Sequence, residues 1–294
     1  MSSAADIAGM QHKVPPISLR RRVTDHAMTG IAILTVIVVL VPLVAIFGYL
    51  LYRGLASLNW AFLTQTPKPP GEVGGGVANG IIGSAMILGV ASLLGVPLGI
   101  GAGIYLAEYG RNRLGDTVRF TADVLNGVPS IVIGIVAYAI VVLRWHFSAL
   151  AGGVALAIMM VPTISRTTEE MLLLVPQALR EAAYGLGIPR WRTTLSITLR
   201  SATSGVITGV MLAFARVAGE TAPLLFTTLG NEFWNLNLLQ PTAALPLQVF
   251  NYAKSPYDDW HRQAWAGALV LILLIVGSIA AVRYAVRRGT FGAA

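Results

Sequence analysis

Six long apolar segments follow one another along this chain of 294 residues, separated by polar stretches that carry most of the arginine. A helix needs about 20 mostly apolar residues to cross a bilayer. The fourth segment is shorter than the others and contains Pro162. The pattern predicts an all-α polytopic membrane protein with six spanning helices, at about residues 28–52, 80–107, 121–143, 149–165, 201–229 and 263–286.

The basic residues predict how these helices are oriented, because cytoplasmic loops carry an excess of lysine and arginine. If the fourth segment did not span, Arg166 to Arg200 would lie outside the cell, against this bias. We therefore expect both termini in the cytoplasm. The predicted divisions are a cytoplasmic tail at residues 1–27, a transmembrane domain at 28–290, a cytoplasmic loop at 166–200 and extracytoplasmic loops at 53–79 and 230–262.

Composition agrees with membrane residence. Hydrophobic residues make up 55% of the chain and charged residues only 12%, whereas a soluble domain has about 25% charged residues. The net charge of +8 would also fit a nucleic-acid-binding protein. No basic stretch is interleaved with aromatic residues as binding to single strands requires. We therefore expect a lipid bilayer, and no nucleic acid, around this chain.

Several kinds of chemistry are not expected. The chain has no cysteine, and its four histidines are scattered without the spacing of metal ligands. It has no G-x-x-x-x-G-K-[ST] loop of the kind that cradles nucleotide phosphates. We therefore predict no metal site, no cofactor and no ATP hydrolysis on this chain.

Two charged residues, Arg216 and Glu220, interrupt the fifth apolar segment. Arg216 would lie ~24 Å along the helix from Arg200, near the middle of the membrane, with Glu220 one turn further on the same face. A buried arginine costs at least about 2.5 kcal/mol and usually marks a pathway. Its planar fork also suits an oxyanion. An internal Arg216–Glu220 pair that only packs the bundle is the alternative. Thr221 is adjacent, and Pro223 invites a kink.

Other polar residues in the membrane segments carry weaker predictions. Asp123 and Asn126 open the third segment and could cap a helix end or line a path, and Ser130 could line the same path. Glu169 and Glu170 are expected on a solvated face beside Arg166.

Glycines recur every four residues in the second segment, at Gly95, Gly99 and Gly103. This spacing lets helices approach closely. The partner helix could belong to the same chain or to a second subunit.

The loop at 166–200 contains a helix–turn–helix pattern. Residues 180–184 favour a short helix, which Gly185 and Gly187 would end, and a second short helix could begin near Pro189. Glu181 offers a charge for an anchoring pair. By chemistry alone, this segment is either a docking elbow for another protein or an ordinary interfacial loop.

This loop resembles the EAA loop of ABC importer permeases, and the residues that match its pattern are Glu181, Ala182, Ala183, Gly187, Ile197 and Leu199. Arg200 stands where the pattern has proline, so the bend into the fifth helix is open to question. The run from Arg216 to Thr227 is similar to the fifth helix of the permeases of ABC phosphate importers, of the PstA rather than the PstC type.

The resemblance implies a type I ABC importer permease fold in the bacterial inner membrane. It implies a sister permease of the PstC kind, a PstB-like ATPase homodimer that holds ATP and Mg²⁺, and a PstS-like extracytoplasmic phosphate-binding protein. The EAA loop, with Glu181, Ala182, Ala183 and Gly187, would dock on the ATPase and couple ATP hydrolysis to alternating access.

On this interpretation Arg216 binds phosphate, and Thr221 lies on the same path. Glu220 either competes with the anion for Arg216 or accepts the proton of hydrogen phosphate, which sulfate lacks. The same residues would also serve a permease for sulfate, molybdate, phosphonate or another oxyanion.

Two further classes compete with the permease. A stand-alone secondary transporter would explain the buried charges, but it leaves the EAA loop unexplained, and no internal symmetry is visible. An intramembrane enzyme lacks a nucleophile–base set in this sequence.

Overall fold

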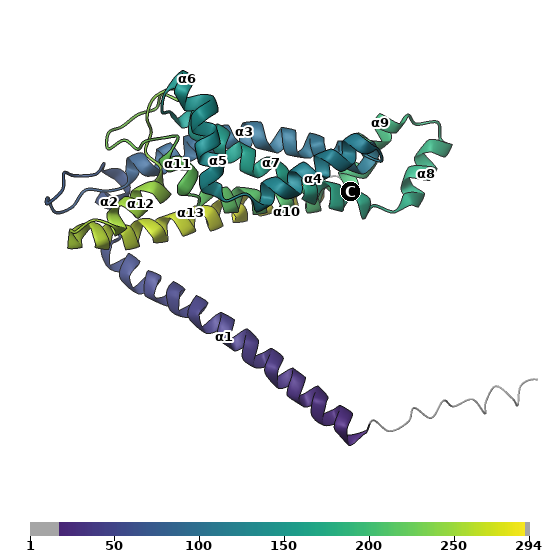
Figure 1. Ribbon diagram of the computed structural model, residues 1–294, viewed down its shortest axis with the longest axis horizontal. Helices are drawn as coiled ribbons and strands as arrows, with labels where there is room; N and C mark the ends of the chain where they lie inside the picture. Colours follow the sequence, from purple (N-terminus) through teal and green to yellow (C-terminus); the bar gives the residue numbers. More distant parts are fainter. Residues whose placement is uncertain (1–17, 292–294) are drawn as a thin grey trace, which may run out of the picture. The chain divides into compact units, whose positions relative to one another are not determined.

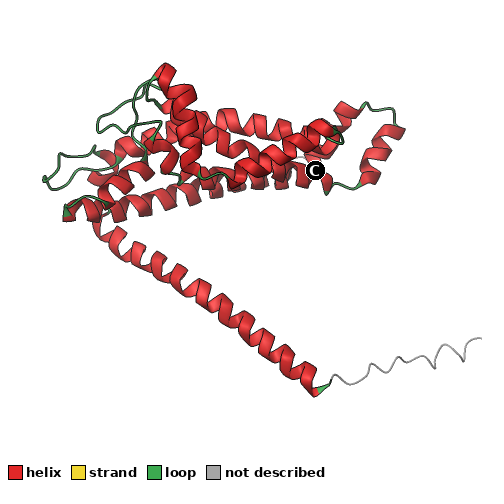
Figure 2. Cartoon of the chain, in the orientation of Figure 1, coloured by secondary structure: helices red, strands yellow, loops and turns green. Residues whose placement is uncertain are grey.

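The structure is a computed structural model, and it describes residues 18–291. These residues are helical apart from connecting loops and one isolated bridge between Leu229 and Thr242 (Figure 2). The chain divides into two units, one ending at Tyr49 and one beginning at Leu50. Residues 1–17 of the predicted tail at 1–27 lie outside the described part. The rest of that tail is helical from Leu19, where α1 begins.

Five helices in the described part of the chain are long and apolar enough to cross a membrane. They are α1 (Leu19–Ser57), α3 (Ala78–Glu108), α7 (Ala149–Leu173), the continuous helix Arg190–Ala218, and α13 (Asp258–Phe291). A bent pair supplies a sixth span if its two halves count as one. The predicted fold class, an all-α polytopic membrane protein, is confirmed.

The third span is not the single helix predicted at 121–143. It consists of α4 (Arg113–Gly127) and a second helix, Ser130–Trp145, which meet at an angle of 107°. The second helix is made of α5 (Ser130–Ala137), the π-helical turn η1 (Tyr138–Val142) and α6 (Leu143–Trp145). Pro129 disfavours helical geometry in the residue before it, and Val128 is extended, with φ −69° and ψ 132°. The bend therefore has a local cause.

The fourth span, α7, is longer than the predicted 149–165, because it continues to Leu173. Ser148 caps its first turn by accepting a hydrogen bond from the amide of Ala151 at 3.1 Å. Pro162 lies inside the helix without ending it. The helix continues through Arg166 and Glu169 because these charges are paired within the fold.

The fifth span lies earlier in the chain than the predicted 201–229, because it begins at Arg190 and ends at Ala218. It runs from α9 (Arg190–Thr193) through the π-helical turn η2 (Thr194–Thr198) into α10 (Leu199–Ala218). The helix passes Arg200 without a break, so the residue in place of the family proline leaves no sharp bend. It ends at Gly219, and the chain resumes as the short α11 (Ala222–Leu225), which has a proline in its first turn.

The glycines of the second span pack against the same chain. A Cβ on Gly95, Gly99 or Gly103 would come within 3.0 Å of side chains on α7, belonging to Met160, Ile164 and Thr168. This close approach explains why α3 and α7 run side by side along the bundle (Figure 1). Of the two interpretations of the glycine spacing, the structure supports packing within the subunit.

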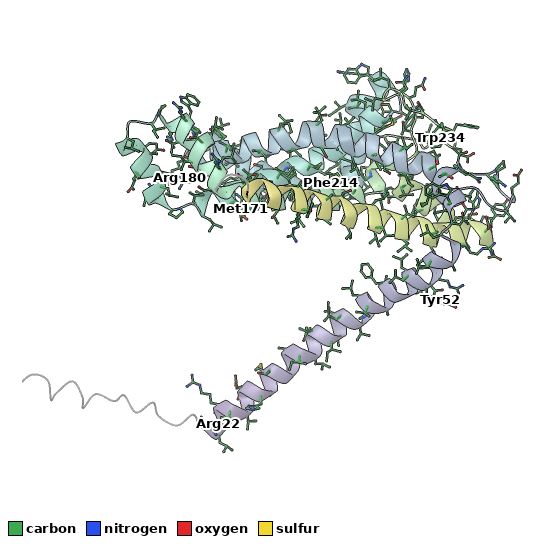
Figure 3. All side chains as sticks on the ribbon, turned by 180° about the vertical axis from the view of Figure 1, so that it is seen from behind. Arg22, Tyr52, Met171, Arg180, Phe214 and Trp234 are labelled. Atoms are coloured by element: carbon green, nitrogen blue, oxygen red, sulfur yellow. The ribbon has the colours of Figure 1, made fainter. Side chains whose placement is uncertain are left out.

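The bundle carries small elements at both ends. At one end, α8 (Gln177–Gly185) and α9 project beyond the long helices (Figure 1). At the other end, the predicted loops 53–79 and 230–262 contain α2 (Trp60–Thr64) and α12 (Leu245–Ala253). Arg180 and Trp234 mark these opposite ends in Figure 3.

Candidate functional site

Arg216 occupies the last turn of α10, and its side chain is exposed in the isolated chain. Glu220 is half-buried. Within the described residues, neither the Arg216 side chain nor the Glu220 side chain forms an ion pair or a hydrogen bond. The alternative of an internal Arg216–Glu220 pair is therefore wrong, and the guanidinium keeps its donors available.

The depth of Arg216 in the bundle follows from its neighbours. Val217 and Ala213 belong to a buried cluster that also contains Ile87 and Leu156. Ile87 lies ~14 Å along α3 from its first residue, Ala78, at a rise of ~1.5 Å per residue. This turn of α10 is therefore level with the interior of the long helices and not with their ends.

Glu220 does not continue the helical face of Arg216, as the sequence had predicted. Gly219 ends α10, and Glu220 and Thr221 lie in a non-helical segment before α11. The carbonyl of Thr221 accepts hydrogen bonds from the amides of Leu224 and Leu225 at 3.1 and 3.2 Å. The predicted kink near Pro223 is thus a complete break, which begins at the glycine.

The break is held firmly by its surroundings. A Cβ on Gly134 of α5 would lie 2.6 Å from the Cα of Pro223, so the two backbones touch. After α11, the hydroxyls of Thr227 and Thr228 are fully buried and donate to the carbonyls of the residues four positions earlier, at 2.8 and 2.9 Å. Irregular backbone inside a membrane protein is tolerated where protein or a water-filled cavity covers it.

Arg216 ends a strip of exposed residues on α10, which sequence reasoning missed. The strip consists of Arg200, Ser204, Thr208, Leu212 and Arg216, spaced four residues apart. Neighbours four apart are close on a helix surface, but each step turns by about 40°, so the strip winds around α10. The hydroxyl of Thr208 donates to the carbonyl of Ser204 at 2.8 Å. The four-residue spacing of polar residues was visible in the sequence and could have revealed the strip.

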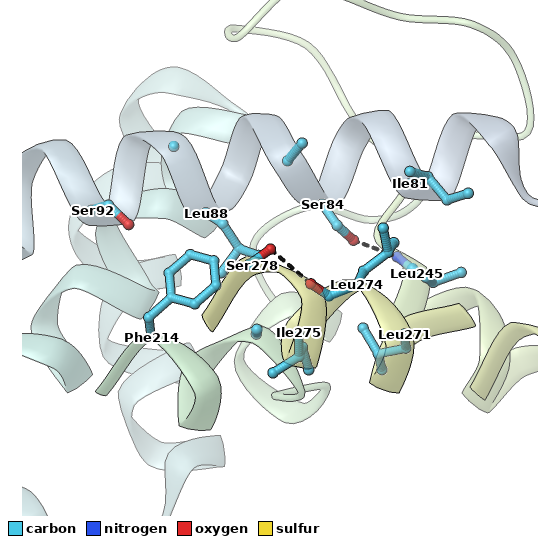
Figure 4. A pocket seen from close by; sticks show the side chains of 13 residues that line it. Ile81, Ser84, Leu88, Ser92, Phe214, Leu245, Leu271, Leu274, Ile275 and Ser278 are labelled. Atoms are coloured by element: carbon cyan, nitrogen blue, oxygen red, sulfur yellow. Dashed lines mark hydrogen bonds between the residues drawn. The ribbon is translucent and has the colours of Figure 1, made fainter. Parts of the chain in front are cut away.

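A separate apolar groove of about 320 Å³ lies between α3, α10 and α13 (Figure 4). From α10 it is lined by Phe214 and Ala218. Each of these residues is two positions from Arg216, which places the arginine about 200° around the helix from them. The groove and Arg216 therefore occupy different sides of α10.

Asp123 and Glu169 belong to a network of charges between α4 and α7, contrary to the helix cap predicted for Asp123 and the solvated face predicted for Glu169. Glu169 is 3% exposed and accepts from Arg119 Nε at 2.7 Å and from Arg166 Nη1 at 2.9 Å. Arg166 Nε also pairs with Asp123 at 3.0 Å. Asp123 caps no helix start, because α4 begins at Arg113. Glu170 is exposed, as expected.

Asn126 and Ser130 stand on either side of the bend in the third span. Asn126 lies in the last turn of α4 and accepts a hydrogen bond from the Thr163 hydroxyl at 3.0 Å. Ser130 is the first residue of α5 and is half-buried. No contact brings either residue to Arg216 in the described part of the chain. In the same part, no group of histidine, aspartate and glutamate gathers to hold a metal.

The loop with the EAA pattern forms the predicted helix–turn–helix. Helix α8 ends at Gly185 and α9 begins after Pro189. Between them Gly187 has φ +75°, a left-handed conformation that suits glycine. Ala183 is buried, while Ala182 and Glu181 are exposed.

Within this chain, the loop is anchored by a neighbour of Glu181. The anchoring pair is formed by the residue before it, Arg180, whose Nε lies 3.2 Å from the carboxylate of Glu108 at the end of α3. The side chain of Glu181 makes no such contact among the described residues. It therefore stays available on the outer surface of the loop.

The chain matches known proteins over most of its length. Residues 95–289 match the family of binding-protein-dependent transport system inner membrane components. The chain is 50% identical to the phosphate transport system permease protein PstA of Yersinia pestis, over 76% of this chain and 77% of that protein. It is 45% identical to the PstA protein of Haemophilus influenzae, over 87% of this chain and 91% of that protein.

Among solved structures, the chain is similar to one of the inward-facing MetNI methionine ABC transporter, with a TM-score of 0.55 and 17% identity. The likeness covers 72% of this chain and 93% of that one. It confirms the fold that the EAA loop implied.

Proposed function

Since the chain belongs to the family of binding-protein-dependent transport system inner membrane components, and within it to the PstA permeases, we propose that it is one permease subunit of an ATP-driven importer of inorganic phosphate. It is a multi-pass protein of the bacterial inner membrane. It forms half of the translocation path, and a PstC-like sister permease forms the other half.

The observation that carries this proposal is the free guanidinium of Arg216, exposed at a level between the ends of the long helices. Its side chain is exposed in the isolated subunit and has no carboxylate partner in the described residues. An unpaired arginine facing lipid at this depth costs several kcal/mol, so it faces a path or a partner. A guanidinium binds phosphate oxygens in a planar, bidentate arrangement.

The strip of exposed residues on α10 that ends at Arg216 indicates the direction of the path. Thr208 and Ser204 add hydroxyls at intervals of ~6 Å along α10, and Arg200 adds a second cation at the far end. Hydroxyls and arginines are suitable groups for an anion that sheds water. One arginine leaves a divalent anion incompletely balanced, so a cation from the sister permease completes the site.

Glu220 and Thr221 contribute to the phosphate site because they lie in the break of the fifth span. Discontinuous helices form the substrate sites of many transporters, because free backbone groups there can contact an ion. Glu220 stands next to the end of α10 without a partner, where its carboxylate accepts the proton of hydrogen phosphate or competes with the anion for Arg216. Sulfate lacks that proton, so an acceptor site rejects it.

Energy enters through α8 and α9, which carry the EAA pattern. A PstB-like ATPase homodimer binds ATP and Mg²⁺ and docks against exposed residues of this loop, including Glu181 and Ala182. Closure of the ATPase moves the loop and tilts the bundles of the two permeases, so that the Arg216 region opens alternately to each side. A PstS-like binding protein delivers phosphate at the opposite end.

The test is uptake of radiolabelled phosphate into proteoliposomes that contain the whole complex. Arg216→Lys keeps the charge but loses the planar pair of N–H donors, so uptake falls by about tenfold to a hundredfold, as expected for a charge-assisted contact worth roughly 1.5–3 kcal/mol. Arg283→Lys is the matched control and keeps normal uptake, since Arg283 is exposed on α13. Normal phosphate uptake by Arg216→Lys contradicts bidentate recognition.

Competition distinguishes phosphate from other oxyanions. Excess sulfate or molybdate leaves phosphate uptake unchanged in the wild-type complex, while unlabelled phosphate abolishes it. Glu220→Gln loses the proton acceptor, so sulfate then begins to compete. Preferential uptake of sulfate or molybdate by the wild-type complex would assign the permease to that anion.

A further inference from the structure

A buried carboxylate, that of Glu108, stands at the junction between α3 and the coupling loop. Glu108 is the last residue of α3 and is only 6% exposed. Its Oε1 pairs with Arg180 Nε at 3.2 Å, and the Arg180 side chain is itself 11% exposed. A buried pair of this kind requires a fixed geometry, because each charge left alone would be costly.

Arg180 also attaches α8 to the end of α7. Its Nη1 and Nη2 donate to the carbonyls of Val175 and Leu172, at 2.7 Å each. Leu172 lies in the last turn of α7 and Val175 just beyond its C-terminal end, where a cation is favourable for the helix dipole. One guanidinium therefore joins α3, α7 and α8.

A second arginine attaches the other side of the loop to the same place. Arg190, the first residue of α9, donates from Nη2 to the backbone carbonyl of Glu108. Its guanidinium lies over the ring of Tyr109, with 4.6 Å from Cζ to the ring centroid. Both short helices of the loop are thus fixed to the end of α3.

The two long helices that receive these contacts pack tightly against each other. The glycines of α3 hold it against α7 so closely that a Cβ on Gly99 would lie 2.7 Å from Ile164. A displacement of α8 is therefore passed to the α3–α7 pair through Arg180 and Glu108. The covalent connection of α9 to α10 is a second, separate route.

We infer that Glu108 and Arg180 are positioning residues for coupling, and that their ion pair transmits the movement of the docking loop to the α3–α7 pair. The inference rests on the proposed docking of an ATPase at α8 and α9. In this inference, buried residues outside the EAA pattern transmit the movement of the loop, whereas Glu181 and Gly187 serve docking of the ATPase. Loss of the pair therefore uncouples ATP hydrolysis from transport without detaching the ATPase.

The experiment uses the complete complex in proteoliposomes and compares wild type with Glu108→Gln. It measures the amount of ATPase that co-purifies, basal ATP hydrolysis, and stimulation of hydrolysis by phosphate-loaded binding protein. In Glu108→Gln, co-purification and basal hydrolysis stay at the wild-type level, while stimulation and phosphate uptake fall by about fivefold or more, in the range of typical coupling energies. Glu170→Gln, an exposed carboxylate at the same end of α7, behaves as wild type.

Two additional variants separate transmission from a general role in folding. If Glu108 and Arg180 act as one link, Glu108→Gln/Arg180→Gln loses no more stimulation than the more impaired single variant. The chain has no cysteine, so Glu108→Cys/Arg180→Cys offers the only two thiols on it. A short bismaleimide forms one thioether with each thiol and restores stimulation that the uncrosslinked variant lacks.

Several results would overturn the inference. They are normal stimulation in Glu108→Gln, loss of the ATPase subunits in parallel with stimulation, or a crosslink that restores nothing. Failure of the proposed function has a different signature, since the wild-type complex itself would then show neither phosphate uptake nor stimulation by the phosphate-loaded protein.

Discussion

Gly134 and Pro223 touch where two broken helices meet, and a Cβ on Gly134 would lie 2.6 Å from the Cα of Pro223. Gly134 lies in α5, after the bend at Pro129, and Pro223 lies in α11, after the break at Gly219. Small residues permit such close backbone contacts between membrane helices. The contact therefore fixes the position of the segment that carries Glu220.

The first prediction concerns this contact. Gly134→Ala forces two backbones apart and destabilises the protein by about 1–3 kcal/mol, the usual cost of overpacking. It also lowers phosphate uptake, because α11 and the segment before it shift. Thermal unfolding in detergent and uptake assays measure both effects. Gly101→Ala in α3 is the control, since a Cβ there meets nothing within 4 Å, and equal melting temperatures for the two variants would contradict the role of the contact.

The second prediction concerns the charges between α4 and α7. Glu169→Ala leaves Arg119 and Arg166 without the carboxylate that separates them. The loss is near the lower end of the roughly 3–5 kcal/mol expected for breaking a buried pair, because the arginine side chains are 26% and 31% exposed. Asp123→Asn costs less than about 1 kcal/mol, as exposed pairs do, since the Asp123 side chain is 56% exposed. Melting temperatures that fall equally in the two variants would refute this ranking.

The third prediction concerns the turn between α8 and α9. Gly187 has φ +75°, and an alanine in this left-handed region costs about 1–2 kcal/mol. Gly187→Ala therefore distorts the docking loop, and less ATPase co-purifies with the permease. Gly185→Ala is a matched control two residues away, because its φ is ordinary and a Cβ there meets nothing within 4 Å. Equal recovery of the ATPase with both variants would show that the turn geometry does not matter for docking.

The apolar segments and the docking loop could be predicted from the sequence because both depend on local patterns. Span length follows from hydrophobicity, and the α8–α9 turn follows from Gly185, Gly187 and Pro189. The bend before Pro129 was missed although its local signal was present, and the break at Gly219 was anticipated only as a kink near Pro223. Apolar residues continue through both, and a hydrophobic run does not reveal whether its helix is continuous.

The charged contacts could not be predicted, because they join residues far apart in the chain. Glu169 is paired with Arg119, 50 positions away, and Glu108 with Arg180, 72 positions away. A buried glutamate and a solvated one look alike in a sequence. Arg216 and Glu220 were recognised as unusual from their position in an apolar run, but their separation by the helix end required the backbone.

The last prediction concerns the exposed strip of α10. If phosphate passes along it, Thr208→Val removes a hydroxyl from the path while preserving the shape of the side chain. To donate to phosphate, the hydroxyl must give up its bond to the Ser204 carbonyl, so the net loss is about 0.5–1.5 kcal/mol and the initial rate of phosphate uptake falls by roughly twofold to tenfold. The free protein stays stable, because the exposed Thr208 hydroxyl only donates to the carbonyl of Ser204. Thr203→Val is the control, since Thr203 makes the same kind of bond, to Leu199 at 2.9 Å, but lies outside the strip. Equal uptake by the two variants would place the path elsewhere, whereas a selective loss in Thr208→Val assigns the strip to the path that ends at Arg216.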